Sequence, residues 1–371
     1  MTDYLKTALH SFHINSCAKM APFAGYDMPI QYSTGVLKEH NWVRDSVGIF
    51  DVSHMGQYIL EGEKSAEFLS HITPSPFKKM PLFKSKYTVL TNTSGGIIDD
   101  LIVTRLADDK FYLVLNAACK ENDIKWLTKH LPTTCNITEL NKSLVAIQGP
   151  KAVEVLQKYT GLSLDDFPFM SVQEITIQNM DMLITRSGYT GEDGFEISLQ
   201  HQNAQKLWKI LLTEEDVLPI GLAARDSLRL EAGFPLYGHD LNEKTSPIEA
   251  SMAWLVSKKS TGFIGAERII NERENGAKRY RVGIELQEKG IAREGSKICN
   301  AKGEKIGFLT SGTFSPTLKK AIGQGYIDAK YAEIGTKIYI EIRGKQISAL
   351  THSLSFIKSK TTSTKKRNKN L

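Results

Sequence analysis

The sequence is poor in features that would place it in a membrane or staple it with disulfides. Only four of its 371 residues are cysteine, and Cys17, Cys119, Cys135 and Cys299 form no CxxC pair, so we expect reduced thiols and no metal site. No apolar run approaches the roughly 18 residues of a bilayer span. The first twenty residues contain no arginine and no apolar core, which indicates neither a transit peptide nor a secretory signal. We therefore expect a cytoplasmic protein without membrane contact.

The folded part of the chain also lacks an excess of one charge. The sequence has 47 basic and 41 acidic residues, a net charge of +6, and six of the basic residues lie in the segment 358–371, which has no acidic residue. Without that segment each sign counts 41. We predict a disordered basic tail at 358–371, with weak contact to an acidic partner as the alternative. The neutral body argues against nucleic-acid binding.

Length and composition indicate a globular protein of two or three domains, with 41% hydrophobic and 24% charged residues. We find no internal repeat and no GxGxxG or GxxxxGK[ST] phosphate-binding loop. The periodicity of residues 56–140 predicts an antiparallel sheet with helices on one face, an α+β unit. Its strands are expected at 57–60, 87–91, 97–106, 110–116 and 136–140, and its helices at 63–72 and 120–130.

Two further regions flank this unit. The pattern from 141 to about 275 predicts strands at 143–148, 173–177, 182–186 and 195–199, and helices at 150–158, 204–212 and 221–232. An N-terminal segment with a helix at 36–46 is expected to pack on a later part of the chain. Beyond 276 only short strands are predicted, a pattern typical of a small all-β barrel or sandwich. They lie at 279–286, 296–299, 306–310, 321–327, 337–342 and 346–350.

The predicted strand at 97–106 contains two adjacent aspartates, Asp99 and Asp100. Strand alternation places Asp99 between Ile97 and Leu101 on one face and Asp100 on the other, so one carboxylate must lie in apolar surroundings. A buried carboxylate has to be protonated, paired or matched to a cationic or proton-donating ligand. Alternatively, both accept hydrogen bonds from backbone amides of the preceding glycine turn.

Two other segments are candidates for a binding site. The stretch 186–196 has three glycines within seven residues, a loop in which backbone amides and the Tyr189 ring could reach a ligand, although such a hairpin is also common as a plain turn. The helix at 221–232 carries Arg225 and Arg229 four residues apart. These arginines could equally form a surface ion-pair face with Asp226 and Glu231.

Several uncommon strings occur together and in order, and they resemble the aminomethyltransferase family, the T proteins of the glycine cleavage system. They are PFAGYDMP at 22–29, GIFDVSHMG at 48–56, GGIIDDL at 95–101, IQGP at 147–150, SGYTGEDGFE at 187–196, GLAARDSLRLEAG at 221–233 and TSGTFSPT at 310–317. The resemblance implies a three-domain, folate-binding α+β fold with antiparallel sheets and a C-terminal β-barrel. The domains would be 1–55 plus 141–275, 56–140, and 276–357.

The resemblance also implies the activity. The family transfers the methylene carbon of an aminomethyl group, carried on the lipoyl arm of H protein, to tetrahydrofolate as co-substrate, giving 5,10-methylenetetrahydrofolate and ammonia. The other glycine cleavage components would be indirect partners, and no metal is implied. Matched by motif, the catalytic carboxylate falls on Asp100. The folate-contacting positions fall on Tyr87, Val114, Asn116, Tyr189, Glu196 and Arg225.

The chain departs from the family at its end, because many members carry a folate-contacting tyrosine near the carboxyl terminus and this sequence has none after Tyr339. Two alternatives share the expected fold: a folate-binding protein of iron–sulphur enzyme maintenance, and a non-catalytic folate-binding protein. The former carries a KGCYxGQE-like motif, whereas the corresponding stretch at 260–267 reads STGFIGAE and lacks the cysteine.

Overall fold

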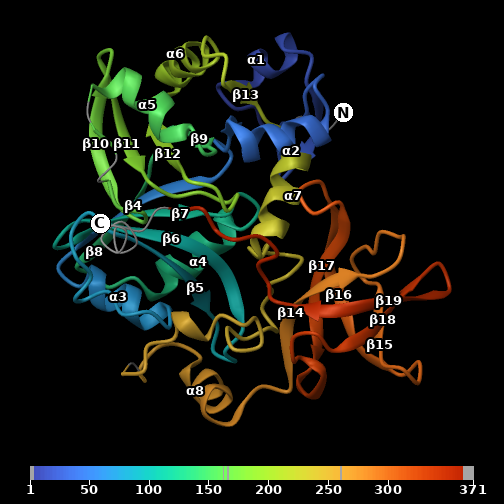
Figure 1. Cartoon of the computed structure of the whole chain (residues 1–371). Helices are drawn as coiled ribbons and strands as arrows, with labels where there is room; N and C mark the ends of the chain where they lie inside the picture. Colours follow the sequence, from blue (N-terminus) through green and yellow to red (C-terminus); the bar gives the residue numbers. More distant parts are fainter. Residues whose placement is uncertain (1–3, 162, 165–166, 260, 362–371) are drawn as a thin grey trace, which may run out of the picture.

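Helix α7 (Leu222–Ala232) lies between three β-structures in the computed structural model, which describes residues 4–161, 163–164, 167–259 and 261–361. Two of the β-structures are open sheets, and the third is a closed barrel. Figure 1 shows one sheet in green at the top, one in cyan at the left and the barrel in orange and red at the right, with α7 in the middle. The predicted α+β fold with a C-terminal barrel is confirmed.

The first sheet joins the N-terminal segment to the region after residue 140. Its strand order is β10-β11-β12-β9-β3-β13, and all neighbours run antiparallel apart from β13 and β3. Helices α5 (Ala152–Thr160) and α6 (His201–Leu211) pack on it through a shared apolar core. The strands are β3 (Val47–Asp51), β9 (Ser143–Gln148), β10 (Val172–Ile177), β11 (Met180–Thr185), β12 (Gly194–Leu199) and β13 (Val217–Pro219).

The second sheet is antiparallel, with strand order β5-β6-β7-β4-β8. One face is covered by α3 (Ser65–Ile72) and α4 (Lys120–His130), as predicted. The other face packs on residues from the segment after α7, among them Leu241, Ala250 and Met252. The strands are β4 (Gly56–Gly62), β5 (Ser85–Thr91), β6 (Ile97–Ala107), β7 (Lys110–Leu115) and β8 (Cys135–Glu139).

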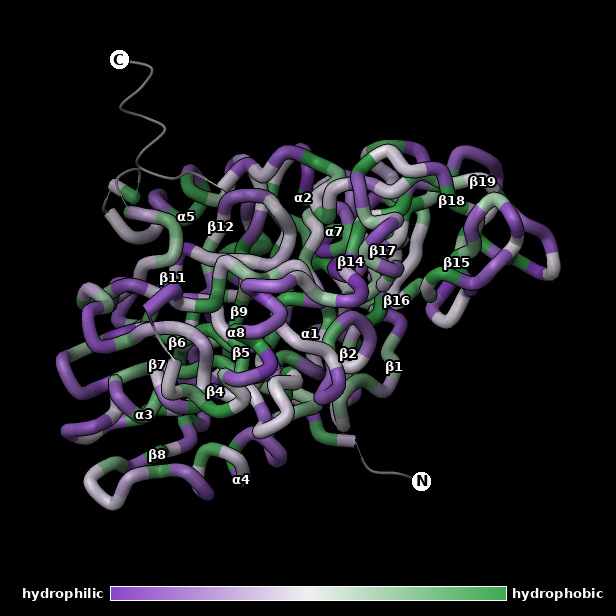
Figure 2. The backbone as a smooth tube through the Cα atoms, turned by 90° about the horizontal axis from the view of Figure 1, so that it is seen from below, coloured by the Kyte–Doolittle hydropathy of each residue, from purple (hydrophilic) through white to green (hydrophobic). Residues whose placement is uncertain are grey.

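The C-terminal barrel closes in the order β14-β17-β16-β15-β18-β19. Branched side chains alternate into its interior, and the core includes Ile284, Leu309, Ile338 and Ile340. Figure 2 shows hydrophobic colour along the strands and hydrophilic colour on the outer turns. The strands are β14 (Arg279–Leu286), β15 (Lys297–Cys299), β16 (Lys305–Ser315), β17 (Lys320–Asp328), β18 (Lys337–Ile342) and β19 (Lys345–His352).

Several short elements were not predicted from the sequence. Most of them are too short to show a period, and β1 and β2 contain proline, which argues against a strand. The helix predicted at 36–46 is α2 (Val36–Asp45), and it packs on α7 as part of the N-terminal segment. The missed elements are α1 (His10–Asn15), β1 (Lys19–Phe23), β2 (Tyr26–Gln31), β3, β13, α8 (Ala266–Asn275) and the 3₁₀ turns η1 (Ala253–Leu255) and η2 (Ala329–Tyr331).

The predicted tail lies partly within the described residues. Residues 358–361 follow the barrel and pass the glycine-rich loop, where the backbone N–H of Lys360 donates to the carbonyl oxygen of Gly191 at 2.9 Å. Lys360 Nζ also lies 3.1 Å from Glu192 Oε1. Residues 362–371 are outside the described part of the chain. The proposed domain limits stay predictions.

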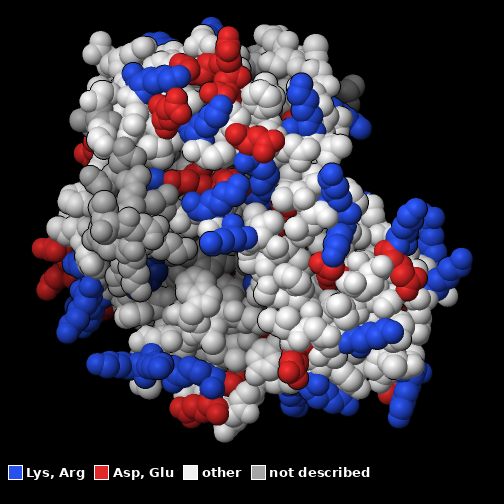
Figure 3. Space-filling model, in the orientation of Figure 1, with Lys and Arg blue, Asp and Glu red and all other residues white. Residues whose placement is uncertain are grey.

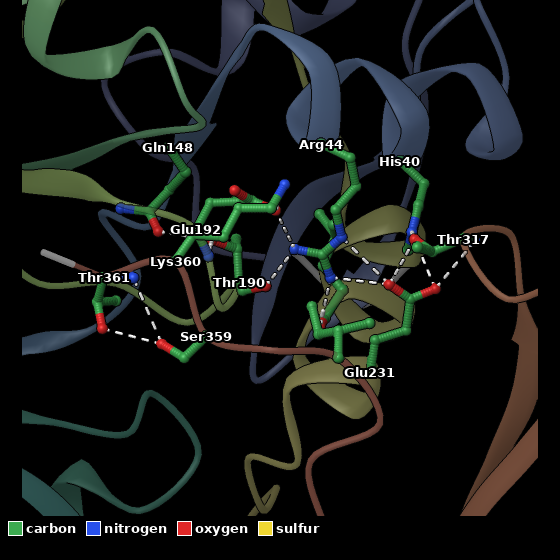
Figure 4. A network of polar contacts seen from close by, with 12 residues as sticks. His40, Arg44, Gln148, Thr190, Glu192, Glu231, Thr317, Ser359, Lys360 and Thr361 are labelled. Atoms are coloured by element: carbon green, nitrogen blue, oxygen red, sulfur yellow. Dashed lines mark hydrogen bonds and ion pairs between the residues drawn. The ribbon is translucent and has the colours of Figure 1, made fainter.

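The carboxylate of Glu231 joins α2, α7 and the barrel (Figure 4). This side chain is fully buried, and it accepts hydrogen bonds from Arg44 Nη2 at 2.9 Å and from Thr317 Oγ1 at 2.7 Å. His40 Nε2 lies 3.1 Å from its second oxygen. Burial alone would raise the pKa of Glu231, but His40, Ser315 and Arg44 together lower it to about 2. The group is therefore ionised, and its partners come from α2 and from the barrel region.

Removing Arg44 should be strongly destabilising, because the buried carboxylates of Glu231 and Glu192 both pair with it. We predict that Arg44→Ala lowers the free energy of unfolding by about 3–5 kcal/mol. Lys297→Ala, which removes an exposed pair with Glu341, is the control and should change it by less than about 1 kcal/mol. Urea unfolding followed by circular dichroism measures both, and equal losses would contradict this account of Glu231.

Candidate functional site

The two aspartates of β6 lie at the end of a glycine turn that packs on the segment after α7. A Cβ at Gly96 would lie 1.7 Å from the carbonyl oxygen of Glu243, so only glycine fits there. The next residues contain a β-bulge: Ile97 pairs with Thr91 and Asp99 with Leu90, which leaves Ile98 unpaired. Bulges redirect side chains and are common beside active sites.

The bulge corrects the predicted alternation. Asp99 shares its face with Leu101 and Val103, which belong to the core under α3 and α4, whereas Ile97 belongs to the core on the opposite face. Asp100 lies on that opposite face, beside Tyr87. Asp99 is fully buried, and Asp100 is partly exposed.

Asp100 is held by two neutral donors. Tyr87 Oη donates to its Oδ2 at 2.9 Å, and Asn116 Nδ2 donates to its Oδ1 at 2.9 Å. Burial, followed by the negative charge of Asp99, raises the pKa of Asp100 to about 7, although both hydrogen bonds act in the opposite direction. The group therefore changes charge close to neutral pH.

Asp99 is bound by the same asparagine. Its Oδ1 accepts from Asn116 Nδ2 at 2.9 Å and its Oδ2 from the Asn116 backbone N–H at 3.2 Å. The amides of Gly95 and Gly96 donate to Asn92 instead. The alternative in which the turn amides bind both aspartates is therefore wrong for the described contacts. Burial raises the pKa of Asp99.

The glycine-rich loop places Tyr189 and Glu196 near α7. The Tyr189 ring stacks on Phe234 at 5.5 Å and 13°, and its hydroxyl donates to the carbonyl oxygen of Pro235. Glu196, in β12, is partly exposed and accepts a hydrogen bond from Ser187 Oγ at 2.6 Å. The ring and the carboxylate are thereby both fixed in place.

The two arginines of α7 have different environments. Arg229 is buried and pairs with Asp226 and with Asp240. The contact with Asp226 was expected, but the predicted surface face with Glu231 is wrong, because Glu231 pairs with Arg44. The Arg225 guanidinium lies 4.7 Å from the centre of the Tyr189 ring, and its buried Nη1 has no hydrogen-bond partner among the described residues. Burial lowers the pKa of Arg225, and the charge of Glu196 partly offsets that. A guanidinium with a buried N–H group that lacks a partner is suited to bind a carboxylate.

The remaining candidate positions follow from β7. Val114 pairs in register with Ile102 and packs against a core that includes Phe50 and Val52. Asn116 comes directly after the strand and bonds both aspartates. The predicted set therefore contains one group built on β5, β6 and β7 and a second built on β12, α7 and the glycine-rich loop.

Sequence reasoning missed Trp254, which lies in η1 and is 68% exposed. Its ring stacks on that of Tyr87, with 6.0 Å between the ring centres and 25° between the ring planes. The hydroxyl of the same Tyr87 donates to Asp100. An exposed tryptophan beside a half-buried polar group is a feature of binding surfaces. No local pattern around residue 254 could have indicated this contact, because Tyr87 lies far away in the sequence.

Comparisons with known proteins agree with this architecture. The family described as GCVT N-terminal domain matches residues 9–260, and the glycine cleavage T-protein C-terminal barrel domain matches 279–358. A solved glycine cleavage system aminomethyltransferase T from Bartonella henselae superposes with a TM-score of 0.93 at 40% identity, covering 97% of this chain and 100% of that one.

Curated relatives are similar over nearly their whole length. An aminomethyltransferase of Phocaeicola vulgatus is 41% identical over 354 residues, covering 93% of this chain and 98% of its own. A mitochondrial aminomethyltransferase of Dictyostelium discoideum is 40% identical, covering 95% and 92%. The fold and site thus define a one-carbon transferase of the glycine cleavage T-protein class. The chain belongs to the aminomethyltransferase family.

These relatives give no support to the iron–sulphur alternative. Within the described ranges, no three His, Cys, Asp or Glu side chains are grouped so as to hold a metal ion, and no helix is long and apolar enough to cross a membrane. On the face drawn in Figure 3, basic and acidic side chains are interspersed and form no single basic patch.

The pKa of Asp100 can be measured directly. We predict that NMR titration of the protein with ¹³C-labelled aspartate carboxyls gives about 7 for Asp100. Asp99→Asn should move it toward the ordinary value, because the neighbouring negative charge is removed. Asp109→Asn, at the exposed turn after the same strand, should leave it unchanged. A pKa that does not respond to Asp99→Asn would contradict the electrostatic coupling.

Proposed function

We propose that this aminomethyltransferase takes the methylene carbon from an aminomethyl group on the lipoyl arm of H protein and transfers it to tetrahydrofolate. The products are 5,10-methylenetetrahydrofolate, ammonia and the reduced lipoyl arm. The observation that carries the proposal is Asp100, a carboxylate held by Tyr87 and Asn116 on a partly buried strand face.

Asp100 is suited to the bond-breaking step. When the carbon–sulphur bond breaks, its electron pair stays on sulphur and the aminomethyl carbon becomes part of a cationic iminium. A carboxylate fixed in a poorly hydrated site stabilises such a cation without having to reorient. Because the pKa of Asp100 is about 7, the ionised form that this role needs is available at neutral pH and decreases below it.

The second group of residues is suited to tetrahydrofolate. A pterin presents adjacent N–H donors that Glu196 could accept in pairs, and its flat ring can contact Tyr87 and Tyr189. Val114 and Asn116 border the same strand face as Asp100. Arg225 has a buried Nη1 without a partner among the described residues, which favours a ligand carboxylate, such as the glutamate of the folate, over a neighbouring side chain.

The carrier would approach as a protein. The proposal therefore includes lipoylated H protein as the direct partner, the other glycine cleavage components as indirect ones, and the cytoplasm as the compartment. The tail contact at Lys360 lies on Gly191 and Glu192, next to Tyr189 and Glu196. Truncation at Ile357 tests whether this segment takes the place of the C-terminal tyrosine that many family members carry.

Asp100→Asn tests the chemistry. The substitution keeps the size but removes the negative charge and replaces one acceptor oxygen by a donor, so turnover should fall by about 10²-fold or more, with a modest loss of folate affinity. The assay reconstitutes aminomethylated H protein with tetrahydrofolate and measures the methylenetetrahydrofolate formed. Asp109→Asn is the control and should keep full turnover. A folded Asp100→Asn enzyme with normal turnover, or wild-type protein that only binds folate, would refute the proposal.

Glu196→Ala tests the folate site. Loss of a charge-assisted pair of hydrogen bonds should weaken tetrahydrofolate binding by about 1.5–3 kcal/mol. Isothermal titration calorimetry measures the affinity, and Glu174→Ala, exposed on the neighbouring part of the same sheet, serves as the control. The site would lie elsewhere if a folded Glu196→Ala protein bound folate as tightly as the wild type.

A further inference from the structure

Asp123 is a buried carboxyl group for which the mechanism above has no use. It lies in the first turn of α4, on the side that faces β6, and is fully buried. Neither of its oxygens accepts a hydrogen bond from any donor of the described residues. Its carboxyl instead meets the carboxyl of Asp99 within hydrogen-bond range. Two ionised carboxylates cannot share such a contact, so a proton must lie between them.

The hydrogen bonds of Asp99 indicate which group holds the proton. Both oxygens of Asp99 already accept from Asn116, one from the side chain and one from the backbone. No donor within the described ranges bonds to Asp123, so it gains a partner only by donating. We propose that Asp123 is a positioning residue of the transferase, a neutral carboxylic acid whose O–H donates to Asp99 and thereby fixes Asn116 and Asp100. This inference rests on the proposed role of Asp100.

The contacts form a continuous path from helix to reacting group. Asp123 meets Asp99, Asp99 accepts from Asn116, and the same Asn116 amide donates to Asp100 Oδ1 at 2.9 Å. Tyr87 holds the other oxygen of Asp100. A shift of Asp99 would therefore change the direction in which Asn116 presents its amide, and with it the position of the carboxylate on the substrate side.

A neutral Asp123 also controls the charge beside Asp100. The groups that face it are Asp99 and Asp100 from β6, Cys119 at the start of α4, Tyr58 from β4 and Tyr237 from the segment after α7. Burial, followed by the charge of Asp99, raises the pKa of Asp123 to about 10. An ionised Asp123 would add a second negative charge and raise the pKa of Asp100 beyond about 7, leaving it protonated at neutral pH.

Simple helix capping does not explain Asp123. An acidic residue in the first turn of a helix favours the helix dipole from an exposed position, and Glu121 occupies such a position in the same turn. Asp123 faces the sheet, where an apolar side chain would pack without the cost of burying a polar group. Glu121 therefore provides the matched control: an acid of the same helix turn that is not in contact with Asp99.

The proton can be observed without any turnover. Infrared spectroscopy of the whole protein distinguishes the carbonyl stretch of a protonated carboxyl, which shifts in heavy water, from that of a carboxylate. We expect a protonated carboxyl that persists from pH 8 to 9, where Asp100 has ionised, and that disappears in Asp123→Asn but remains in Glu121→Gln. If wild-type and Asp123→Asn spectra are identical in this range, the proposal is overturned, whatever the enzyme's activity.

Kinetics then test positioning. Asp123→Asn keeps a neutral donor and should retain turnover within about threefold, whereas Asp123→Leu cannot donate and should lose about tenfold or more in kcat with little change in KM for tetrahydrofolate.

The pH profile is a second test. The wild type should lose activity as pH rises through about 10, and Asp123→Asn should not. Equal losses in the Asn and Leu variants would overturn the proposal. If Asp123→Leu does not fold, the pH profile of Asp123→Asn decides. Wild-type protein without transfer activity would refute the proposed function and leave the infrared result standing.

Discussion

The structure depends on one constraint, that a carboxylate removed from water must find a cation, a donor or a proton. Glu231 shows the first solution, since Arg44, His40 and two hydroxyl-bearing residues surround it at the junction of α2, α7 and the barrel. The final segment of the chain is bound there too, because the backbone carbonyl of Glu231 accepts from Phe356 and Ile357. A cluster of charge-assisted contacts thus holds together parts that are far apart in the sequence.

In the candidate site the same constraint raises the pKa of the carboxyl groups, whereas at Glu231 it is lowered. Glu231 and Asp240 have arginine partners, and their pKa values lie below the ordinary range. Asp99, Asp100 and Asp123 are hydrogen-bonded by neutral groups or by one another, and burial raises the pKa of all three. Carboxylates paired with arginine therefore stabilise the architecture, while those buried without a cation have the raised pKa values that are common at functional sites.

Sequence reasoning predicted much of this arrangement. The long strands and helices showed clear periodicity, and two adjacent aspartates in a strand were recognisable as an anomaly. It could not predict the bulge at Ile98, which moves Ile97 to the face of the sheet opposite to that of Asp99. Nor could it separate Arg225 from Arg229, since both have the same helical spacing and only the distant Asp240 distinguishes them. The environments of Trp254 and Asp123 depend on contacts between residues far apart in the sequence, which local sequence patterns do not reveal.

Helix α7 links the paired carboxylates to the second group of candidate site residues. In one turn of the helix Arg225 lies over the Tyr189 ring. In the next turn Arg229 pairs with Asp240 and donates to Ser311 of the barrel. Glu231 follows and pairs with Arg44. The paired residues cannot move without leaving buried charges unpaired, so they fix the rotation and height of the helix. Arg225 gains its position from that rigidity. The Arg225 guanidinium, whose Nη1 has no hydrogen-bond partner among the described residues, is thus held in place by neighbours that are paired.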